Sequence, residues 1–137
     1  MNDAAFWREL GQQLRVDSIR ASDAAGSGHP TSSMSAADVI AVLLAKHLHY
    51  DFGRPEDPRN DHLILSKGHA CPVLYAVMAQ CGYSPVDKLN TLRKLGSIYQ
   101  GHPDVRFLPA LEASTGSLGQ GLSLAIGMGM AARLNHR

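Results

Sequence analysis

Hydrophobic side chains recur at the spacing of an α-helix along the first third of the chain. The first such run extends from Ala4 to about Ala25 and ends at a Gly-Ser-Gly turn. A second helix is predicted from Ser35 to about His49, because the sequence from Ser35 to Asp38 has the form of a capping box. Apolar residues cover most of the circumference of this second helix, so we expect it to be deeply buried.

The rest of the chain divides into shorter apolar runs separated by turns. Residues 51–61 are polar and contain two prolines, which is typical of a loop. The apolar run at residues 62–66 predicts a short buried strand. Further helices are predicted at residues 72–80, 84–96 and 118–135, where glycine or a Ser-Pro pair marks a boundary. No repeat or linker divides the chain, so we expect one domain containing helices and a strand.

Composition and charge narrow the classes of protein to consider. The 137 residues carry 13 basic against 12 acidic side chains, and 45% of them are hydrophobic, which is typical of a globular domain. A net charge of +1 provides no general attraction to nucleic acid or to an anionic membrane, and no apolar run is long enough to span a bilayer. Two cysteines are too few for a disulfide framework. We therefore expect a cytoplasmic protein that binds neither nucleic acid nor membrane.

Three histidines share one local setting, in which the imidazole directly follows a glycine at a turn: His29, His69 and His102. Glycine allows a sharp turn or a close approach to a ligand, so the three side chains are candidates for a shared polar pocket. Their wide spacing, without a cysteine pair, favours proton transfer or hydrogen bonding to phosphate and hydroxyl oxygens over metal binding. Solvated turn histidines are the alternative. The other histidines are interpreted as structural or exposed: His47, His49, His62 and His136.

A turn of small residues from Ser114 to Gly121 precedes the last predicted helix. Its backbone N–H groups could face a ligand, but its glycine spacing fits neither the dinucleotide-binding fingerprint nor a P-loop. Three glycines inside the helix weaken it by about 1 kcal/mol each relative to alanine, so we expect them to allow close packing against another element: Gly121, Gly127 and Gly129. The hydroxyls of Thr31, Ser32 and Ser33 are candidates for helix capping or for binding a phosphate.

Taken in order, these motifs resemble the N-terminal region of the transketolases. The resemblance covers most of the chain and rests on four motifs: Ala-Gly-Ser-Gly-His29-Pro, Leu-Ser-Lys-Gly-His69-Ala, Gln-Gly-His102-Pro and Ser-Thr-Gly116-Ser-Leu-Gly-Gln-Gly. The segments that begin at Leu92 and Glu112 are most similar to the separate N-terminal subunit of a split transketolase. The resemblance implies an α/β fold. Residues 1–137 would form the helical N-terminal part of a three-layer α/β/α thiamine-diphosphate-binding domain, which is incomplete here.

The resemblance also implies a reaction and a set of site residues. Such enzymes use thiamine diphosphate and Mg²⁺ or another divalent cation to transfer a two-carbon ketol unit from a ketose phosphate to an aldose phosphate. His29 and His102 are then the catalytic residues, which contact substrate hydroxyls and assist proton transfer. His69 faces the cofactor diphosphate with Ser32 beside it. The aminopyrimidine and thiazolium side of the cofactor is lined by Gly116, Ser117 and Leu118.

The sequence departs from the family pattern in one respect. The Gly-Asp-Gly signature and the later asparagine that hold the metal do not occur in these residues, so no metal ligand is assigned to this chain. We therefore expect a truncated chain that is inactive alone and acts as a homo-oligomer or with a C-terminal transketolase subunit. The alternatives are a non-catalytic fragment or pseudogene product, and an enzyme similar to deoxyxylulose-phosphate synthase.

Overall fold

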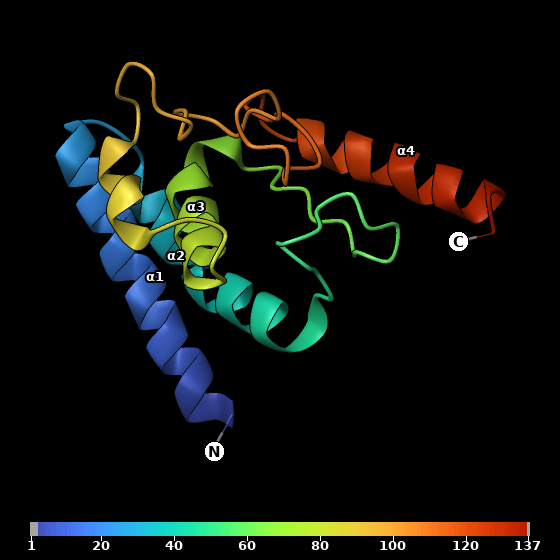
Figure 1. Ribbon diagram of the computed structural model, residues 1–137, viewed down its shortest axis with the longest axis horizontal. Helices are drawn as coiled ribbons and strands as arrows, with labels where there is room; N and C mark the ends of the chain where they lie inside the picture. Colours follow the sequence, from blue (N-terminus) through green and yellow to red (C-terminus); the bar gives the residue numbers. More distant parts are fainter. Residues whose placement is uncertain (1–2, 137) are drawn as a thin grey trace.

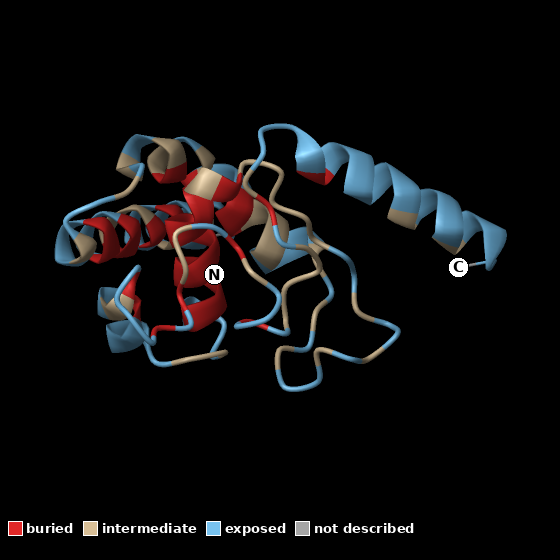
Figure 2. Ribbon diagram, turned by 90° about the horizontal axis from the view of Figure 1, so that it is seen from above, coloured by how far each residue is buried: buried red, intermediate tan, exposed pale blue. Residues whose placement is uncertain are grey.

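An almost completely buried helix lies at the centre of the structure, a computed structural model that describes residues 3–136. This helix, α3 (Cys71–Gln80), has nine consecutive buried residues. It packs against α1 (Asp3–Ala25), α2 (Pro30–Val42) and the short 3-10 helix η3 (Val86–Thr91) (Figure 1). Figure 2 shows the buried residues gathered in this cluster of helices. The core therefore sits around α3, as expected for a helix whose side chains are apolar on every face.

Helix α1 agrees with the prediction and is joined to α3 through a buried carboxylate. Leu14 and Asp17 lie on the buried face of α1. The side-chain amides of Gln13 and Gln80 each donate a hydrogen bond of 2.8 Å to a different oxygen of Asp17. A buried carboxylate is costly unless it is hydrogen-bonded, so these two amides stabilise the contact between α1 and the end of α3.

Helix α2 begins five residues earlier than predicted. His29 is its N-cap and Pro30 opens its first turn, a position that suits proline because the first N–H groups of a helix have no partner within it. The predicted capping box is wrong: Ser35 lies inside the helix and donates to the carbonyl of Ser32 at 2.9 Å. Asp38 instead pairs with Arg15 of α1, through contacts of 2.5 and 2.9 Å.

The burial of α2 is one-sided, which corrects the expectation of a deeply buried helix. Its buried residues are Ser33, Ala37, Ile40 and Ala41, whereas Val39 is 69% exposed. The helix continues into a π-helical turn, η1 (Leu43–His47), and the chain then enters the loop predicted at residues 51–61. That loop is held by local ion pairs, such as Arg54 with Asp51 at 2.8 Å.

The predicted strand at residues 62–66 does not form, and no strand occurs between residues 3 and 136. The segment is irregular, with a bend at Ser66, and has no neighbouring strand in the described chain. Side chains hold it instead: Thr115 donates to the carbonyl of Leu65 at 2.8 Å, and the Ser66 hydroxyl accepts the backbone N–H of Leu122 at 3.2 Å. An apolar run predicts burial, but a strand also needs a partner for its backbone groups.

The predicted helix at residues 84–96 is reduced to η3. The chain leaves it at Leu92 in an extended conformation and turns back, so that the backbone N–H of Arg93 donates to the carbonyl of Tyr99 at 2.9 Å. Leu92 and Tyr99 are both buried, and their packing favours this return over another helical turn. The glycine at the end of the predicted helix, Gly96, has a φ of +81° within the loop.

Helix α4 (Gln120–Leu134) extends away from the other helices (Figure 1). It begins after Gly119, whose φ is +86°. Among the described residues of α4 only Gly121 is buried, and Figure 2 shows the helix almost entirely in the colour of exposed residues. Its exposed apolar side chains include Leu122, Ile126, Met130 and Leu134. Within residues 3–136, no helix has the length and apolar character needed to cross a membrane.

Candidate functional site

The three Gly-His turns meet although they are far apart in sequence. His29 stands at the start of α2, and His69 lies in the 3-10 turn η2 (Gly68–Ala70) that leads into α3. Their rings meet edge to face, with centroids 5.3 Å apart. His102, from the loop before α4, is close enough that both other imidazoles influence its pKa. The expected cluster of three histidines is therefore present in the structure, while the role of each remains a prediction.

Glycines make the close approach of these segments possible. A Cβ atom on Gly68 would lie 2.6 Å from the carbonyl oxygen of Thr115 and 2.9 Å from the backbone nitrogen of Gly116, which is closer than real atoms approach. A Cβ on Gly116 would in turn lie 3.4 Å from the His102 ring. The backbone of Gly68 therefore touches the turn before α4, and that turn brings Gly116 against His102.

Side chains of α3 hold the loop that carries His102 in place. The hydroxyl of Tyr75 points at the carbonyl oxygens of Gln100 and His102, at 3.0 and 3.1 Å. The Cys71 thiol lies 3.2 Å from the carbonyl oxygen of Gly101. Burial raises the pKa of Cys71 to about 12 and that of Tyr75 further above its ordinary value. Both groups therefore stay protonated at neutral pH and serve as hydrogen-bond donors to the loop.

The imidazole of His102 has a lowered pKa although it lies at the surface. Partial desolvation of the ring is the largest cause, followed by the positive charge of Arg93 and then by His69 and His29. Each of these effects disfavours the imidazolium form. His102 is consequently neutral at physiological pH, the form in which an imidazole can accept a proton or a hydrogen bond.

The predicted cofactor-binding residues differ in how close they lie to the three histidines, and Ser32 is on an element that contacts the His69 turn. Ser32 lies in the first turn of α2, and its neighbour Ser33 donates to the carbonyl of Ala70, next to His69, at 3.4 Å. Lys67 reaches the same turn, with its Nζ atom 3.0 Å from the hydroxyl of Ser35 and 3.4 Å from the carbonyl oxygen of Ser32. Lys67 is not among the predicted site residues, although it stands two positions before His69 in the same Leu-Ser-Lys-Gly-His-Ala motif.

Two other predicted residues stay at the edge of the site. Ser117 is exposed and Leu118 is 77% exposed, and in the described part of the chain neither side chain makes a hydrogen bond or ring contact with the three histidines. Gly116 is the only one of the three predicted cofactor-lining residues that touches the histidine cluster. Between residues 3 and 136, no group of three His, Cys, Asp or Glu side chains could hold a metal ion.

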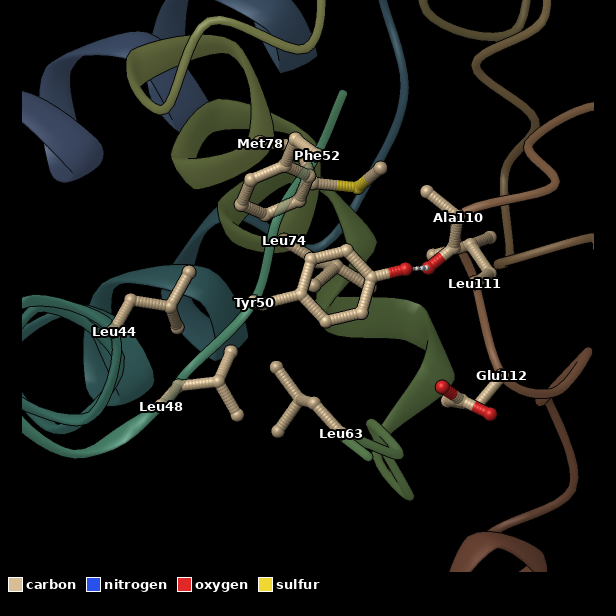
Figure 3. A pocket seen from close by; sticks show the side chains of 10 residues that line it. All are labelled: Leu44, Leu48, Tyr50, Phe52, Leu63, Leu74, Met78, Ala110, Leu111 and Glu112. Carbon is tan, nitrogen blue, oxygen red and sulfur yellow. Dashed lines mark hydrogen bonds between the residues drawn. The ribbon is translucent and has the colours of Figure 1, made fainter. Parts of the chain in front are cut away.

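The pocket shown in Figure 3 is separate from this cluster and has a different character. It measures about 30 Å³ and its lining is mostly apolar, with Leu44, Leu63 and Leu74 among its side chains. Tyr50 donates to the carbonyl of Ala110 at 3.1 Å on one side of it. None of the three histidines lines the cavity, and its size suits a single water-sized group rather than a cofactor.

Comparison with known proteins agrees with the predicted resemblance. The family described as transketolase, thiamine diphosphate binding domain, matches residues 8–136. The chain belongs to this family. Transketolase of Pongo abelii is 49% identical over 121 residues, which are 88% of this chain and 19% of that protein. A 6-deoxy-6-sulfo-D-fructose transketolase subunit of a Clostridium strain is 41% identical over 111 residues, 81% of this chain and 40% of that subunit.

Solved structures of transketolases have the same fold in this region. Transketolase of Campylobacter jejuni matches with a TM-score of 0.88 at 36% identity, over 93% of this chain and 20% of that one. Transketolase of Leishmania mexicana matches with a TM-score of 0.85 at 32% identity, over 88% of this chain and 18% of that one. The predicted resemblance to transketolases, which are transferases, is confirmed. A helical structure that matches this region also fits the predicted fold class, an incomplete α/β domain.

The chain spans about a fifth of the length of the first transketolases that it matches, the share being 19% for the Pongo abelii protein. The share of the Clostridium subunit is larger, at 40%.

Proposed function

We propose that this chain forms the diphosphate-facing half of a transketolase-type active site, with His69 and Ser32 directed at the cofactor and His29 and His102 at the substrate. The observation that carries the proposal is the meeting of His29 and His69 at 5.3 Å, with His102 close enough to interact with both. Three imidazoles held together by glycine turns suit a ligand rich in hydroxyl and phosphate oxygens. Domain 1–137 is accordingly proposed as a partial thiamine-diphosphate-binding domain.

The residues present fit the diphosphate group of the cofactor. The absence of side chains at Gly68 and Gly116 lets the turn before α4 lie directly against the η2 turn and the His102 ring, so backbone groups of these turns lie beside the histidines. Lys67 supplies a positive charge beside the first turn of α2, which suits an anion. When bound, thiamine diphosphate supplies the electron sink that makes cleavage of a carbon–carbon bond next to a carbonyl possible.

The proposed division of work follows from the surroundings of each histidine. His102 is neutral at physiological pH, so its free nitrogen can accept a proton from a substrate hydroxyl, and its loop is held by Tyr75. His29 stands at the start of α2 and is exposed beside His69, so its ring can orient a second hydroxyl. Ser117 and Leu118, with Gly116, are proposed to line the cofactor's ring side through backbone as well as side-chain atoms.

Mg²⁺ or another divalent cation is proposed as a partner of the cofactor, held by residues that are not part of this sequence. Within residues 3–136, no group of three His, Cys, Asp or Glu side chains could hold it. Sugar phosphates are the proposed substrates and the pentose phosphate pathway in the cytoplasm the proposed setting. We also propose a homo-oligomer or a complex with a C-terminal transketolase subunit that supplies the pyrimidine-binding domain. The exposed leucines of α4 and the similarity to a relative named as a subunit support this arrangement. Alone, the chain is expected to bind the cofactor weakly and not to turn over.

A graft into a complete enzyme tests the proposed roles. Residues 8–136 would replace the matching segment of the Campylobacter jejuni transketolase, followed by assays of ketol transfer and cofactor affinity. His69→Ala is expected to weaken cofactor binding about 10-fold or more, as the loss of a hydrogen bond to a charged group would. His102→Ala is expected to lower kcat/KM about 100-fold with near-normal cofactor affinity.

The exposed His49 provides the control, because His49→Ala removes an imidazole from outside the cluster. A folded and active graft in which all three alanine variants behave alike would refute the proposed roles. A graft that folds and binds the cofactor but transfers no ketol unit would favour a non-catalytic binding module.

A further inference from the structure

Arg93 connects two of the three Gly-His turns, although it lies outside all of them. Its Nη1 atom donates to the hydroxyl of Ser27, two residues before His29, at 2.9 Å. Its Nη2 atom lies 3.5 Å from the carbonyl oxygen of Gly101, the residue before His102. One planar guanidinium therefore contacts a side chain of the first turn and a backbone carbonyl of the third. The several N–H donors of arginine allow this geometry, whereas the single ammonium group of lysine does not.

The residue between Gln100 and His102 in the third turn must itself be small for this contact. A Cβ atom on Gly101 would lie 2.9 Å from Nε and 3.0 Å from Cζ of Arg93, so the guanidinium rests directly on the glycine backbone. Any larger side chain at this position would push Arg93 away. The glycine of the third turn therefore serves the contact with Arg93 in addition to allowing the turn itself.

The backbone of Arg93 is held in a conformation that is rare for residues other than glycine. Its φ is +60°, a value in the left-handed region that L side chains seldom adopt. The buried neighbours Leu92 and Tyr99 hold this turn, with the N–H of Arg93 bonded to the Tyr99 carbonyl at 2.9 Å. Such conformations persist where the surrounding structure requires them, and they gather at functional sites.

We propose that Arg93 is a positioning residue that ties the first Gly-His turn to the third and so sets the arrangement of His29 relative to His102. The inference depends on the proposed function only where it assigns these histidines to the substrate. The contacts of Arg93 with the two turns are present without any ligand. Arg93 is exposed, so its side chain is not part of the buried core.

The same guanidinium acts on His102 electrostatically. The groups that affect its imidazole are Arg93, His69 and His29, and all are positive or become positive on protonation. Together with partial desolvation they keep the pKa of His102 below its ordinary value. Removal of the arginine charge should therefore move the titration of His102 to higher pH, whereas a residue that merely supported the loop would leave it unchanged.

An NMR titration of the imidazole signals, combined with amide hydrogen exchange, tests the proposal on the chain as it is. Arg93→Gln should raise the titration midpoint of His102 and speed exchange about fivefold at Gly26, Ser27 and Gln100, whose N–H groups are hydrogen-bonded, because the turns lose a typical hydrogen bond that holds them. Lys94→Gln is the matched control. It removes the same charge one position away, from a side chain that makes no hydrogen bond to any described residue, and should leave both readouts near wild type.

Two further variants separate charge from geometry. Arg93→Lys keeps the charge but not the fork, so His102 should titrate as in the wild type while exchange at the two turns still increases. Ser27→Ala removes one exposed partner of Arg93 and provides a second test if Arg93→Gln fails to fold. It should speed exchange at the hydrogen-bonded amides of Gly26 and Ser27. Unchanged exchange in folded Arg93→Gln or in Ser27→Ala, or an unchanged His102 midpoint in folded Arg93→Gln, would overturn the proposal. Failure of the chain to bind cofactor would leave it intact.

Discussion

The hydroxyl of Tyr75, in the buried helix α3, lies 3.1 Å from the carbonyl oxygen of His102 and so joins the core directly to the loop that carries a candidate catalytic residue. The same hydroxyl lies 3.0 Å from the carbonyl oxygen of Gln100. Because burial raises the pKa of Tyr75, the hydroxyl is always present as a donor near neutral pH. The position of His102 therefore depends on a helix that contributes nothing to the surface of the site.

Tyr75→Phe is expected to lower the free energy of unfolding by about 1–2 kcal/mol, because it removes the donor and leaves the carbonyl of Gln100 or His102 without its partner. Urea unfolding measures the loss. Tyr83→Phe is the control, since the Tyr83 hydroxyl makes no hydrogen bond within residues 3–136. Equal stability of the two variants would show that the Tyr75 hydroxyl does not hold the loop.

Two glycines of α4 should respond oppositely to alanine. A Cβ on Gly121 would lie 2.6 Å from the Cα atom of Ser66, so Gly121→Ala should destabilise the chain. Gly127 has no atom within 4 Å of its would-be Cβ, so Gly127→Ala should stabilise the helix by about 0.5–1 kcal/mol. Thermal unfolding measures both changes. A clear loss of stability in Gly127→Ala would mean that α4 packs against something in solution.

The two thiols should differ greatly in reactivity. Cys71 is buried and its pKa is raised to about 12, so almost no thiolate is present at pH 8. Cys81 is exposed, and although partial burial raises its pKa as well, its sulfur is accessible. Labelling with a chromogenic disulfide should modify Cys81 alone until the chain is unfolded, and Cys81→Ser should abolish the fast phase. Two fast equivalents in the native chain would disagree with the structure.

His102 should make stability fall in mild acid. Its pKa is lower in the folded chain than in the unfolded chain, so the unfolded state binds more protons between these two values. The free energy of unfolding should therefore decrease as the pH falls from 7 to about 5. His102→Gln should make this decrease smaller, whereas His47→Gln, at an exposed position, should not. An identical pH dependence of unfolding in wild type and His102→Gln would contradict the lowered pKa.

The sequence predicts the helices best where local signals agree. Helix α1 has its apolar spacing and a glycine end, and α3 has an apolar run that ends near Gly82. The start of α2 was misplaced because Ser35 and Asp38 imitate a capping box, although Pro30 marks the true first turn. The strand at residues 62–66 was wrong because an apolar run cannot reveal whether a neighbouring strand exists.

Some features of the site could likewise be predicted from local sequence, and others depend on tertiary structure. The shared Gly-His setting suggested that His29, His69 and His102 would meet, and they do. The contribution of Arg93 could not be read from the sequence, because it depends on a left-handed turn and on the return of the chain to Tyr99. The packing expected of all three α4 glycines holds only for Gly121, because the rest of that helix leaves the core.

The most direct test of the central claim follows the imidazole signals of the chain by NMR while thiamine diphosphate is added, which detects even weak binding. The account predicts shifts at His29, His69 and His102, with His69 also shifting when inorganic diphosphate replaces the cofactor. His47 and His49, which are exposed and outside the cluster, should stay unchanged. An absence of shifts at millimolar cofactor, or equal shifts at all of these histidines, would contradict a cofactor site built from the three Gly-His turns.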